Sequence, residues 1–268
     1  MDVATIKAQL QKLSPETPWA HLMEFAPGVF SVTPDNEQFY KKATGLSLVG
    51  ELLLSVAEMQ VHGHSLAGKR VLDLACGEGG HSVQFAKKGA KVTGVEGRAL
   101  YVDRARFAAE AMGQSDIRII QGDVRRLPTE IGTFDITVFS GILHHLGQDD
   151  FDGMVQELAR VTQDILLVYT HISTADSIKN HRLQGPVKTA AGREGYLFRE
   201  HKDDATAKQR EQQVRASLDN TFSFWAKEES LIDALRSAGF KLILKVVTPH
   251  VFGWEGASYR PILVCKKA

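Results

Sequence analysis

Cysteine is scarce in this chain, which has only Cys76 and Cys265 among its 268 residues. A fold held together by disulfides would need several more cysteines at regular spacing. We therefore expect no disulfide framework, and a reducing cytoplasm is the expected setting. Neither cysteine has the spacing of metal ligands around it. No metal site is expected, and Cys76 is interpreted as a small packing residue.

Long apolar runs and an excess of one charge are also missing. The most apolar stretch, residues 46–57, is interrupted by Glu51, and a bilayer span needs roughly 20 apolar residues. The polar N-terminus lacks the apolar core of a signal peptide. Lysine plus arginine equals aspartate plus glutamate at 32 each, so no global basic field favours nucleic acid. We expect a small-molecule substrate and no membrane or nucleic-acid partner; monomer and homodimer both stay open.

The chain begins with a segment, residues 1–68, in which helices and turns are predicted. Ile6, Leu10 and Leu13 recur at helical spacing, and a second apolar helix is predicted over residues 46–61. Prolines punctuate the stretch between them. These features predict a helical N-terminal extension. The hydrophobic content of 43% is enough for the chain to bury one sizeable core.

Strands and helices then alternate through residues 69–177. Compact apolar strands are predicted at VLDLA, KVTGVE, IRIIQGD, FDITVFS and DILLVYT. Repeated strand–helix–strand units predict an α/β fold with a doubly wound, mostly parallel sheet. Residues 225–268 add a helix and two strands with no helix between them, which predicts an antiparallel pair at one sheet edge.

The alternation fails over residues 178–224, which are polar and carry charges of both signs. A structureless loop of this length is improbable inside a compact domain. We predict a helical insertion that follows the fifth strand and acts as a lid.

The segment that carries the chemistry follows the first predicted strand and reads DLACGEGG. Gly77 and Gly79 permit a sharp turn and a close approach of backbone to a ligand. A dinucleotide fingerprint would place its third glycine at residue 82, where Ser82 stands. The acid Asp73, four residues before Gly77, suits an ammonium group and would oppose a pyrophosphate. A dehydrogenase is therefore disfavoured.

Further polar residues stand at the ends of the next strands. Glu96 ends the second strand and can accept both hydroxyls of a ribose. Asp123 follows the third and can accept from an adenine amino group, although it can also be a turn residue. The fourth strand ends in Ser140 and Gly141. Strand ends of this kind form the ligand crevice of such sheets.

The segments DLACGEGG, GVEG, QGDV and FDITVFSGILHHL together resemble the class I S-adenosylmethionine (SAM)-dependent methyltransferase family. The resemblance is close over about residues 65–172 and implies a Rossmann-like, seven-stranded fold. It implies SAM as cofactor and S-adenosylhomocysteine (SAH) as product. The residues assigned to the cofactor by this resemblance and by their position in the motifs are Asp73, Ala75, Gly77, Gly79, Glu96, Gly97, Asp123, Val124, Ser140 and Gly141.

A weaker resemblance covers residues 19–28 and the block SFWAKEESLIDALRSAGF. It points to relatives of tRNA wobble-uridine carboxymethyltransferases and to methyltransferases of natural-product pathways. The former group would place a tyrosine at position 144 to grip the carboxylate of carboxy-SAM, but this chain has His144. Ordinary SAM is therefore favoured.

Candidates for the chemical step are His144 and His145. A histidine with a near-neutral pKa suits proton removal, and neighbouring residues point differently, so at most one of the two is expected to face substrate. Substrate-binding residues are predicted in the insertion, at Tyr196, Arg199 and His201. Trp225 is interpreted as a core residue.

The function expected from these features is methyl transfer from SAM to an O, N or C atom of a small molecule, with secondary metabolism as one setting. Two alternatives stay open. One is a tRNA-modifying (carboxy)methyltransferase, and the other is a SAM-binding module without catalysis.

Overall fold

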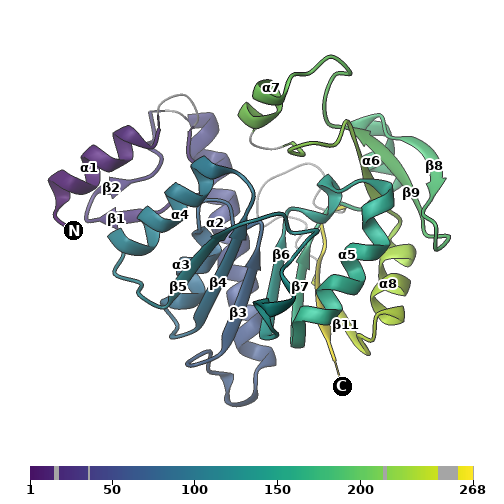
Figure 1. The fold of residues 1–268 in the computed structure, drawn as a ribbon, viewed down its shortest axis with the longest axis horizontal. Helices are drawn as coiled ribbons and strands as arrows, with labels where there is room; N and C mark the ends of the chain where they lie inside the picture. The colour runs from purple at the N-terminus through teal and green to yellow at the C-terminus, as the bar shows by residue number, and fades with distance from the viewer. Residues whose placement is uncertain (15–17, 36, 214–215, 247–258, 268) are drawn as a thin grey trace. The chain divides into compact units, whose positions relative to one another are not determined.

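The computed structural model describes residues 1–14, 18–35, 37–213, 216–246 and 259–267 (Figure 1). The chain divides into two compact units. The N-terminal unit contains residues 1–128 and 134–136, and the C-terminal unit contains residues 129–133 and 137–268.

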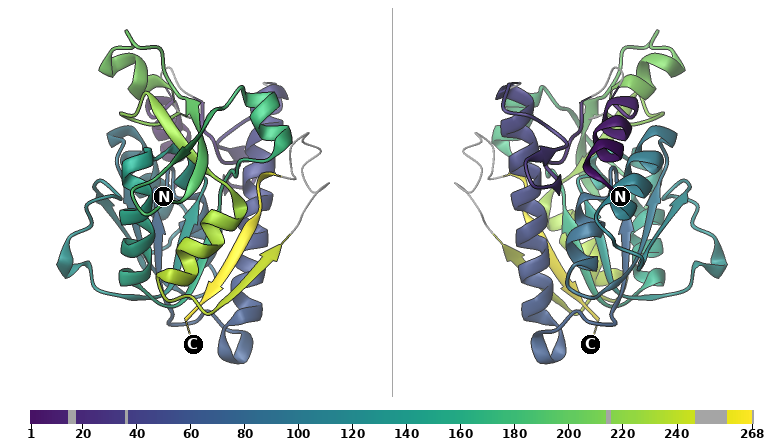
Figure 2. Two further views of the ribbon diagram at one scale, coloured as in Figure 1. Left: turned by 90° about the vertical axis from the view of Figure 1, so that its right-hand side faces the viewer. Right: turned by 90° about the vertical axis from the view of Figure 1, so that its left-hand side faces the viewer.

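The central element is a seven-stranded sheet in the order β11-β12-β7-β6-β3-β4-β5. Its strands are β3 (Arg70–Leu74), β4 (Lys91–Glu96), β5 (Ile117–Gln121), β6 (Phe134–Ser140), β7 (Thr162–Tyr169), β11 (Leu242–Val246) and β12 (Ile262–Lys266). Strand β4 is parallel to β3 and β5, whereas β12 is antiparallel to β7 and β11. The predicted α/β, Rossmann-like fold is confirmed, including the antiparallel pair at one edge. Figure 2 shows β11 and β12 side by side.

The N-terminal unit holds the glycine-rich segment. Its helices are α1 (Val3–Lys12), α2 (Glu37–Gln60), η1 (His62–His64), α3 (Gly80–Ala86) and α4 (Ala99–Ala111). Helix α2 packs on α3, α3 packs on α4, and α4 packs on β5. The predicted N-terminal helices are present, although α2 begins nine residues earlier than the sequence pattern indicated. Between α1 and α2 lies a short hairpin of β1 (Glu24–Ala26) and β2 (Val29–Phe30), which was not predicted.

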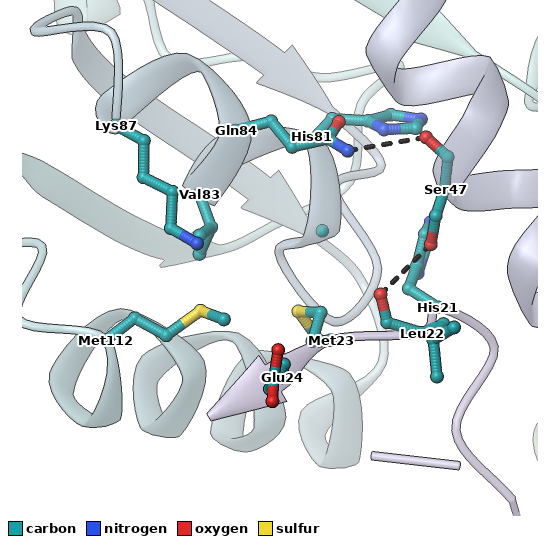
Figure 3. A pocket seen from close by; sticks show the side chains of 11 residues that line it. His21, Leu22, Met23, Glu24, Ser47, His81, Val83, Gln84, Lys87 and Met112 are labelled. Carbon is teal, nitrogen blue, oxygen red and sulfur yellow. Dashed lines mark hydrogen bonds between the residues drawn. The ribbon is translucent and has the colours of Figure 1, made fainter. Parts of the chain in front are cut away.

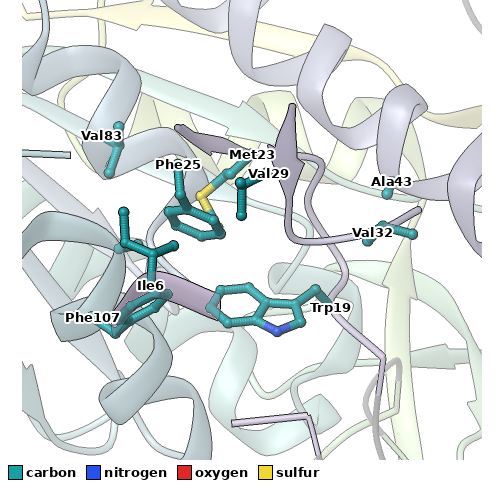
Figure 4. Close-up of a cluster of buried hydrophobic side chains, with 10 residues drawn as sticks. Ile6, Trp19, Met23, Phe25, Val29, Val32, Ala43, Val83 and Phe107 are labelled. Atoms are coloured by element: carbon teal, nitrogen blue, oxygen red, sulfur yellow. The ribbon is translucent and has the colours of Figure 1, made fainter. Parts of the chain in front are cut away.

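A hydrophobic cluster anchors the N-terminal extension (Figure 4). Trp19 and Phe25 of the extension meet Phe107 of α4 edge-on or tilted, with ring centroids 5.1 to 6.2 Å apart. Ile6 of α1 and Val83 of α3 belong to the same cluster. The extension is therefore packed onto the helices that flank the glycine-rich loop.

The C-terminal unit combines helices with a second, smaller sheet. Its helices are η2 (Thr129–Ile131), η3 (Leu143–His145), α5 (Gln148–Val161), α6 (Ala175–His181), α7 (Ala207–Gln212) and α8 (Glu228–Ser237). Helix α5 packs on β7, α8 and β10. The smaller sheet has the order β10-β9-β8, with strands β8 (Gln184–Lys188), β9 (Glu194–Arg199) and β10 (Phe222–Ala226).

The prediction that residues 178–224 are helical was wrong. Apart from the end of α6 and the short α7, the regular structure of this segment consists of the antiparallel strands β8, β9 and most of β10. Tyr196 and Phe198 on β9 stand opposite Trp225 and Ser223 on β10. Aromatic residues favour strands, and the charged residues around these short runs had concealed them.

Candidate functional site

The loop after β3 has the backbone geometry that its glycines predict. Ala75, Gly77 and Gly79 all have positive φ values, of 54°, 55° and 80°. A Cβ on Gly79 would lie 3.2 Å from the Cβ of Ala105, closer than almost all real contacts. The positive φ therefore favours glycine at this position, and the close packing on α4 leaves little room for a side chain.

Two buried carboxylates flank this loop. The Asp73 side chain is 2% exposed and its Oδ2 accepts a 2.6 Å hydrogen bond from Ser82 Oγ. Burial raises the pKa of Asp73 to about 6, although the bond from Ser82 and the charge of His21 act in the opposite direction. A buried carboxylate with a raised pKa is typical of a site that binds a positively charged group.

Glu96, at the end of β4, is bonded to the same loop. Its Oε2 accepts the N–H of Gly77 at 2.9 Å, and its Oε1 accepts the N–H of Arg98 at 2.8 Å. Burial raises the pKa of Glu96, and these backbone bonds lower it in part. Each oxygen keeps a further lone pair for a ligand hydroxyl. The structure therefore brings Asp73, Gly77, Gly79 and Glu96 together, as predicted from the strand ends.

Asp123 has a local partner. Its carboxylate accepts two-pronged hydrogen bonds from the Arg125 guanidinium at 2.8 to 3.2 Å and also the Arg125 N–H at 2.9 Å. Burial raises the pKa of Asp123, but Arg125 lowers it by more, so that the net pKa lies below its ordinary value. The backbone contact is an Asx-type turn. Adenine recognition by Asp123 and the neighbouring Val124, which is buried, stays a prediction.

Cys76 is a packing residue, as expected. It is buried, and burial raises the pKa of its thiol well above the ordinary value. The Cβ of an alanine at Gly94 would lie 2.8 Å from the Cys76 sulfur. The side chain therefore fills space between the loop and β4, and a thiolate nucleophile is disfavoured.

A buried ion pair that the sequence did not reveal holds the N-terminal extension to the loop. Glu78 and Arg104 are fully buried, and their side chains meet at 2.6 Å. Arg104 also donates to the carbonyl oxygens of Leu13 and Pro18. The second Glu78 oxygen accepts the N–H groups of residues 20 and 21 at 2.8 and 3.1 Å. We refer to residues 18–23 as the strap, because these bonds tie them to the glycine-rich loop.

In the C-terminal unit, His144 is deeply buried. Its Nδ1 lies 3.2 Å from Thr170 Oγ1 and accepts the N–H of His171 at 3.3 Å. The two imidazole rings stack with centroids 4.1 Å apart. Burial, and then the charge of His171, place the pKa of His144 well below its ordinary value. The prediction of a near-neutral pKa is therefore wrong for His144, because the buried surroundings of this ring disfavour its charged form.

His145 has a different environment. Its side chain is 16% exposed, and its Nδ1 lies 2.8 Å from Oε1 of Glu200, which is itself buried. Glu200 also accepts the Ser223 hydroxyl at 2.7 Å and the Ser217 N–H at 3.1 Å. A carboxylate at Nδ1 favours the tautomer with that nitrogen protonated and leaves the Nε2 lone pair for a proton. Of the two predicted histidines, His145 has the geometry of a base.

Ser140 and Gly141 lie at the end of β6, as predicted, and the Gly141 N–H donates to Tyr169 at 2.7 Å. They belong to the C-terminal unit. Gly97 follows Glu96 directly and shares its place at the end of β4.

The three predicted substrate residues differ in their surroundings. Arg199 is 45% exposed at its side chain, pairs with Asp203 at 3.1 Å and covers the ring of Phe222. Tyr196 is partly buried on β9. His201 is buried, and its ring nitrogens contact Gln213 Oε1 at 2.8 Å and Ser217 O at 2.6 Å. Because both nitrogens already have partners, these contacts favour a structural role for His201.

An aromatic cluster in the C-terminal unit was also missed. Trp225 is 2% exposed, in agreement with its interpretation as core, and its Nε1 donates to the carbonyl of His144 at 3.1 Å. His171 and His181 pack on its ring, and His181 Nε2 lies 2.9 Å from the Tyr259 hydroxyl. The members are distant in sequence, so no local pattern could have predicted the cluster.

Together, the seven-stranded sheet, the tight glycine turn after β3 and the acid at the end of β4 define a Rossmann-like protein of the kind that binds nucleotide-derived cofactors. Comparison with known proteins narrows this class. A family model described as a methyltransferase domain matches residues 71–164. Residues 71–164 are thus similar to a methyltransferase domain, in agreement with the resemblance that the motifs indicated.

Individual relatives share only parts of the sequence. A sterol 24-C-methyltransferase of Gibberella zeae is 31% identical over 147 residues, which are 49% of this chain and 38% of that protein. A tRNA U34 carboxymethyltransferase of Marinobacter nauticus is 31% identical over 85 residues, which are 31% of this chain and 26% of that protein. The chain therefore covers well under two thirds of these curated relatives.

Among solved structures, the N-terminal domain of EvdMO1 with SAH bound has a TM-score of 0.72. The likeness covers 100% of this chain and 98% of that one at 21% sequence identity, so it establishes the fold. Within the described part of the chain, no helix is both long and apolar enough to cross a membrane.

Proposed function

We propose that this protein binds SAM and transfers its methyl group to a small-molecule acceptor. The observation that carries the proposal is the joint placement of Asp73, Gly77 and Glu96 around one loop, with both acids buried. The methyltransferase-domain match over residues 71–164 supports the same reading.

The residues present fit the cofactor in their chemistry. The Asp73 carboxylate suits the α-ammonium group, and the Glu96 oxygens, each with a free lone pair, suit the two ribose hydroxyls. Gly77 and Gly79 have no side chains and adopt positive φ values, so a ligand can approach the loop backbone closely at these positions. When bound, SAM supplies a methyl group on a sulfonium that is already activated for displacement.

The protein's own contribution is then binding, orientation and proton handling. Asp73 holds the amino-acid end of the cofactor and Glu96 holds its ribose, so that proximity and alignment account for most of the rate increase. His145 Nε2 is available to accept a proton from a hydroxyl or amine acceptor, while Glu200 holds Nδ1. Tyr196 and Arg199 are proposed to recognise the acceptor.

The small-molecule class is favoured over nucleic acid by the balanced charge of 32 basic and 32 acidic residues. The sterol methyltransferase relative acts on a small molecule by its name. The similarity to a tRNA U34 carboxymethyltransferase keeps tRNA modification as the second candidate. His144 in place of the expected tyrosine favours SAM over carboxy-SAM.

Calorimetric titration of SAM and SAH into the protein tests the proposal. Asp73→Ala and Glu96→Ala each remove a charged acceptor, which is worth about 10- to 150-fold in affinity. Asp103→Ala, an exposed acid on α4, is the matched control and should bind as the wild type does. Unchanged affinity in both test variants would contradict the methyltransferase proposal.

The acceptor class is tested with SAM that carries a labelled methyl group. Label should enter the small-molecule fraction of a cell extract and not purified tRNA, with boiled protein as control. Label in tRNA would select the second candidate. SAM binding without label in either fraction would favour a module that binds the cofactor without catalysis.

A further inference from the structure

His21 is the strap residue that lies directly on the glycine-rich loop. A Cβ built on Gly80 would come within 2.8 Å of the His21 ring, and one on Gly77 would be 3.7 Å from its Cε1. A side chain at position 80 would collide with the imidazole where it now lies, so the His21 ring can approach the loop because this residue is glycine. The motif itself suggested glycines only for the turn.

The position of His21 is set by the loop itself. Its backbone N–H donates to Glu78, which is part of the loop and is held in turn by Arg104. The carboxylate and guanidinium are both fully buried. Because a buried, hydrogen-bonded ion pair fixes its neighbours in one arrangement, the loop and the His21 ring form one preorganised assembly.

The His21 imidazole has unused hydrogen-bonding capacity. Its Nδ1 is buried and has no hydrogen-bond partner among the described residues, and Glu78 Oε2 lies 3.5 Å from it. The charge of the ring also acts on Asp73 and lowers the pKa of that acid. His21 lines a cavity of about 180 Å³ together with Ser47 and His81. Figure 3 shows His21 beside Ser47 in this cavity.

The ligand proposed for this loop needs a partner of this kind. The amino-acid end of SAM carries an ammonium and a carboxylate on the same carbon atom. Asp73 can accept from the ammonium but would repel the carboxylate. An imidazole N–H beside Asp73, held close to the carboxylate of Glu78, is a suitable donor for the second group.

We propose that His21 is a cofactor-binding residue that donates a hydrogen bond to the carboxylate of SAM, while Asp73 accepts from its ammonium group. The inference rests on the proposed function and adds to it a contact from outside the methyltransferase-domain match, which begins at residue 71. It makes the strap part of the cofactor site.

The test compares three ligands by calorimetry on the full chain. SAH has the carboxylate, S-adenosyl-3-thiopropylamine lacks only the carboxylate, and 5′-methylthioadenosine lacks the whole amino-acid end. His21→Phe keeps an aromatic ring on the glycines but removes the donor. It should weaken SAH binding by about 10- to 100-fold and leave the other two ligands within about twofold.

His21→Gln retains a donor and should recover part of the SAH affinity. His62→Phe, the same substitution at an exposed histidine outside the strap, is the matched control and should bind all three ligands as the wild type does. Circular dichroism and thermal melting check that each variant is folded.

SAH affinity in His21→Phe equal to that of the wild type would overturn the inference and leave the proposed function intact. An equal loss for SAH and for the decarboxylated analogue would overturn it as well, because the ring would then act by packing. If the wild-type protein bound no SAH, the proposed function itself would fail.

Discussion

The buried carboxylate of Asp73 should lower the stability of the unliganded protein. The side chain is 2% exposed, and burial raises its pKa from 3.8 to about 6. Asn is the same size and can still accept the hydrogen bond from Ser82 Oγ. Asp73→Asn therefore removes the charge while keeping the packing, and we expect this variant to be more stable than the wild type at neutral pH.

The magnitude follows from the pKa difference. Between pH 3.8 and about 6 the folded protein holds a proton that the unfolded chain has lost. Stability therefore falls as the pH rises through this window and is constant above it. A difference of about two pKa units corresponds to about 3 kcal/mol above pH 6, and to less than about 1 kcal/mol near pH 4.

Urea unfolding of both proteins at several pH values measures this difference. Asp73→Asn should be more stable by up to about 3 kcal/mol at pH 7.5, and the two curves should converge near pH 4. The same variant should lose affinity for SAH. A pH-independent difference, or a less stable variant at pH 7.5, would refute the conclusion that the buried charge is retained for ligand binding at the expense of stability.

Two further predictions concern partners found only in the structure. Glu78→Ala leaves the buried Arg104 guanidinium without its carboxylate and should lower the free energy of unfolding in urea by about 3–5 kcal/mol. The double variant Glu78→Leu with Arg104→Met should lose much less. If the losses of the two single variants simply added up in the double variant, the two side chains would not be a coupled pair. Nitrogen NMR should find the proton of neutral His145 on Nδ1 in the wild type, and Glu200→Gln should shift the tautomer towards Nε2. A wild-type proton on Nε2 would remove His145 as a base.

The local pattern of the sequence was sufficient to predict the strands of the large sheet and the residues of the proposed cofactor site. Apolar runs that end in glycines predicted the parallel strands, because a buried strand leaves a short, continuous apolar signal. Asp73, Gly77 and Glu96 were predicted to lie close together for a related reason. They stand at strand ends, and the ends of neighbouring parallel strands meet at one edge of the sheet.

The environment of each side chain was decided only by tertiary structure. Glu78 pairs with Arg104 across 26 residues and with the His21 backbone across 57, and no periodicity encodes such contacts. His144 and His145 are adjacent in sequence, yet one ring is buried on His171 and the other has its Nδ1 beside a buried carboxylate. Burial and partner determine which imidazole can take up a proton, and both depend on residues that folding brings from elsewhere in the chain.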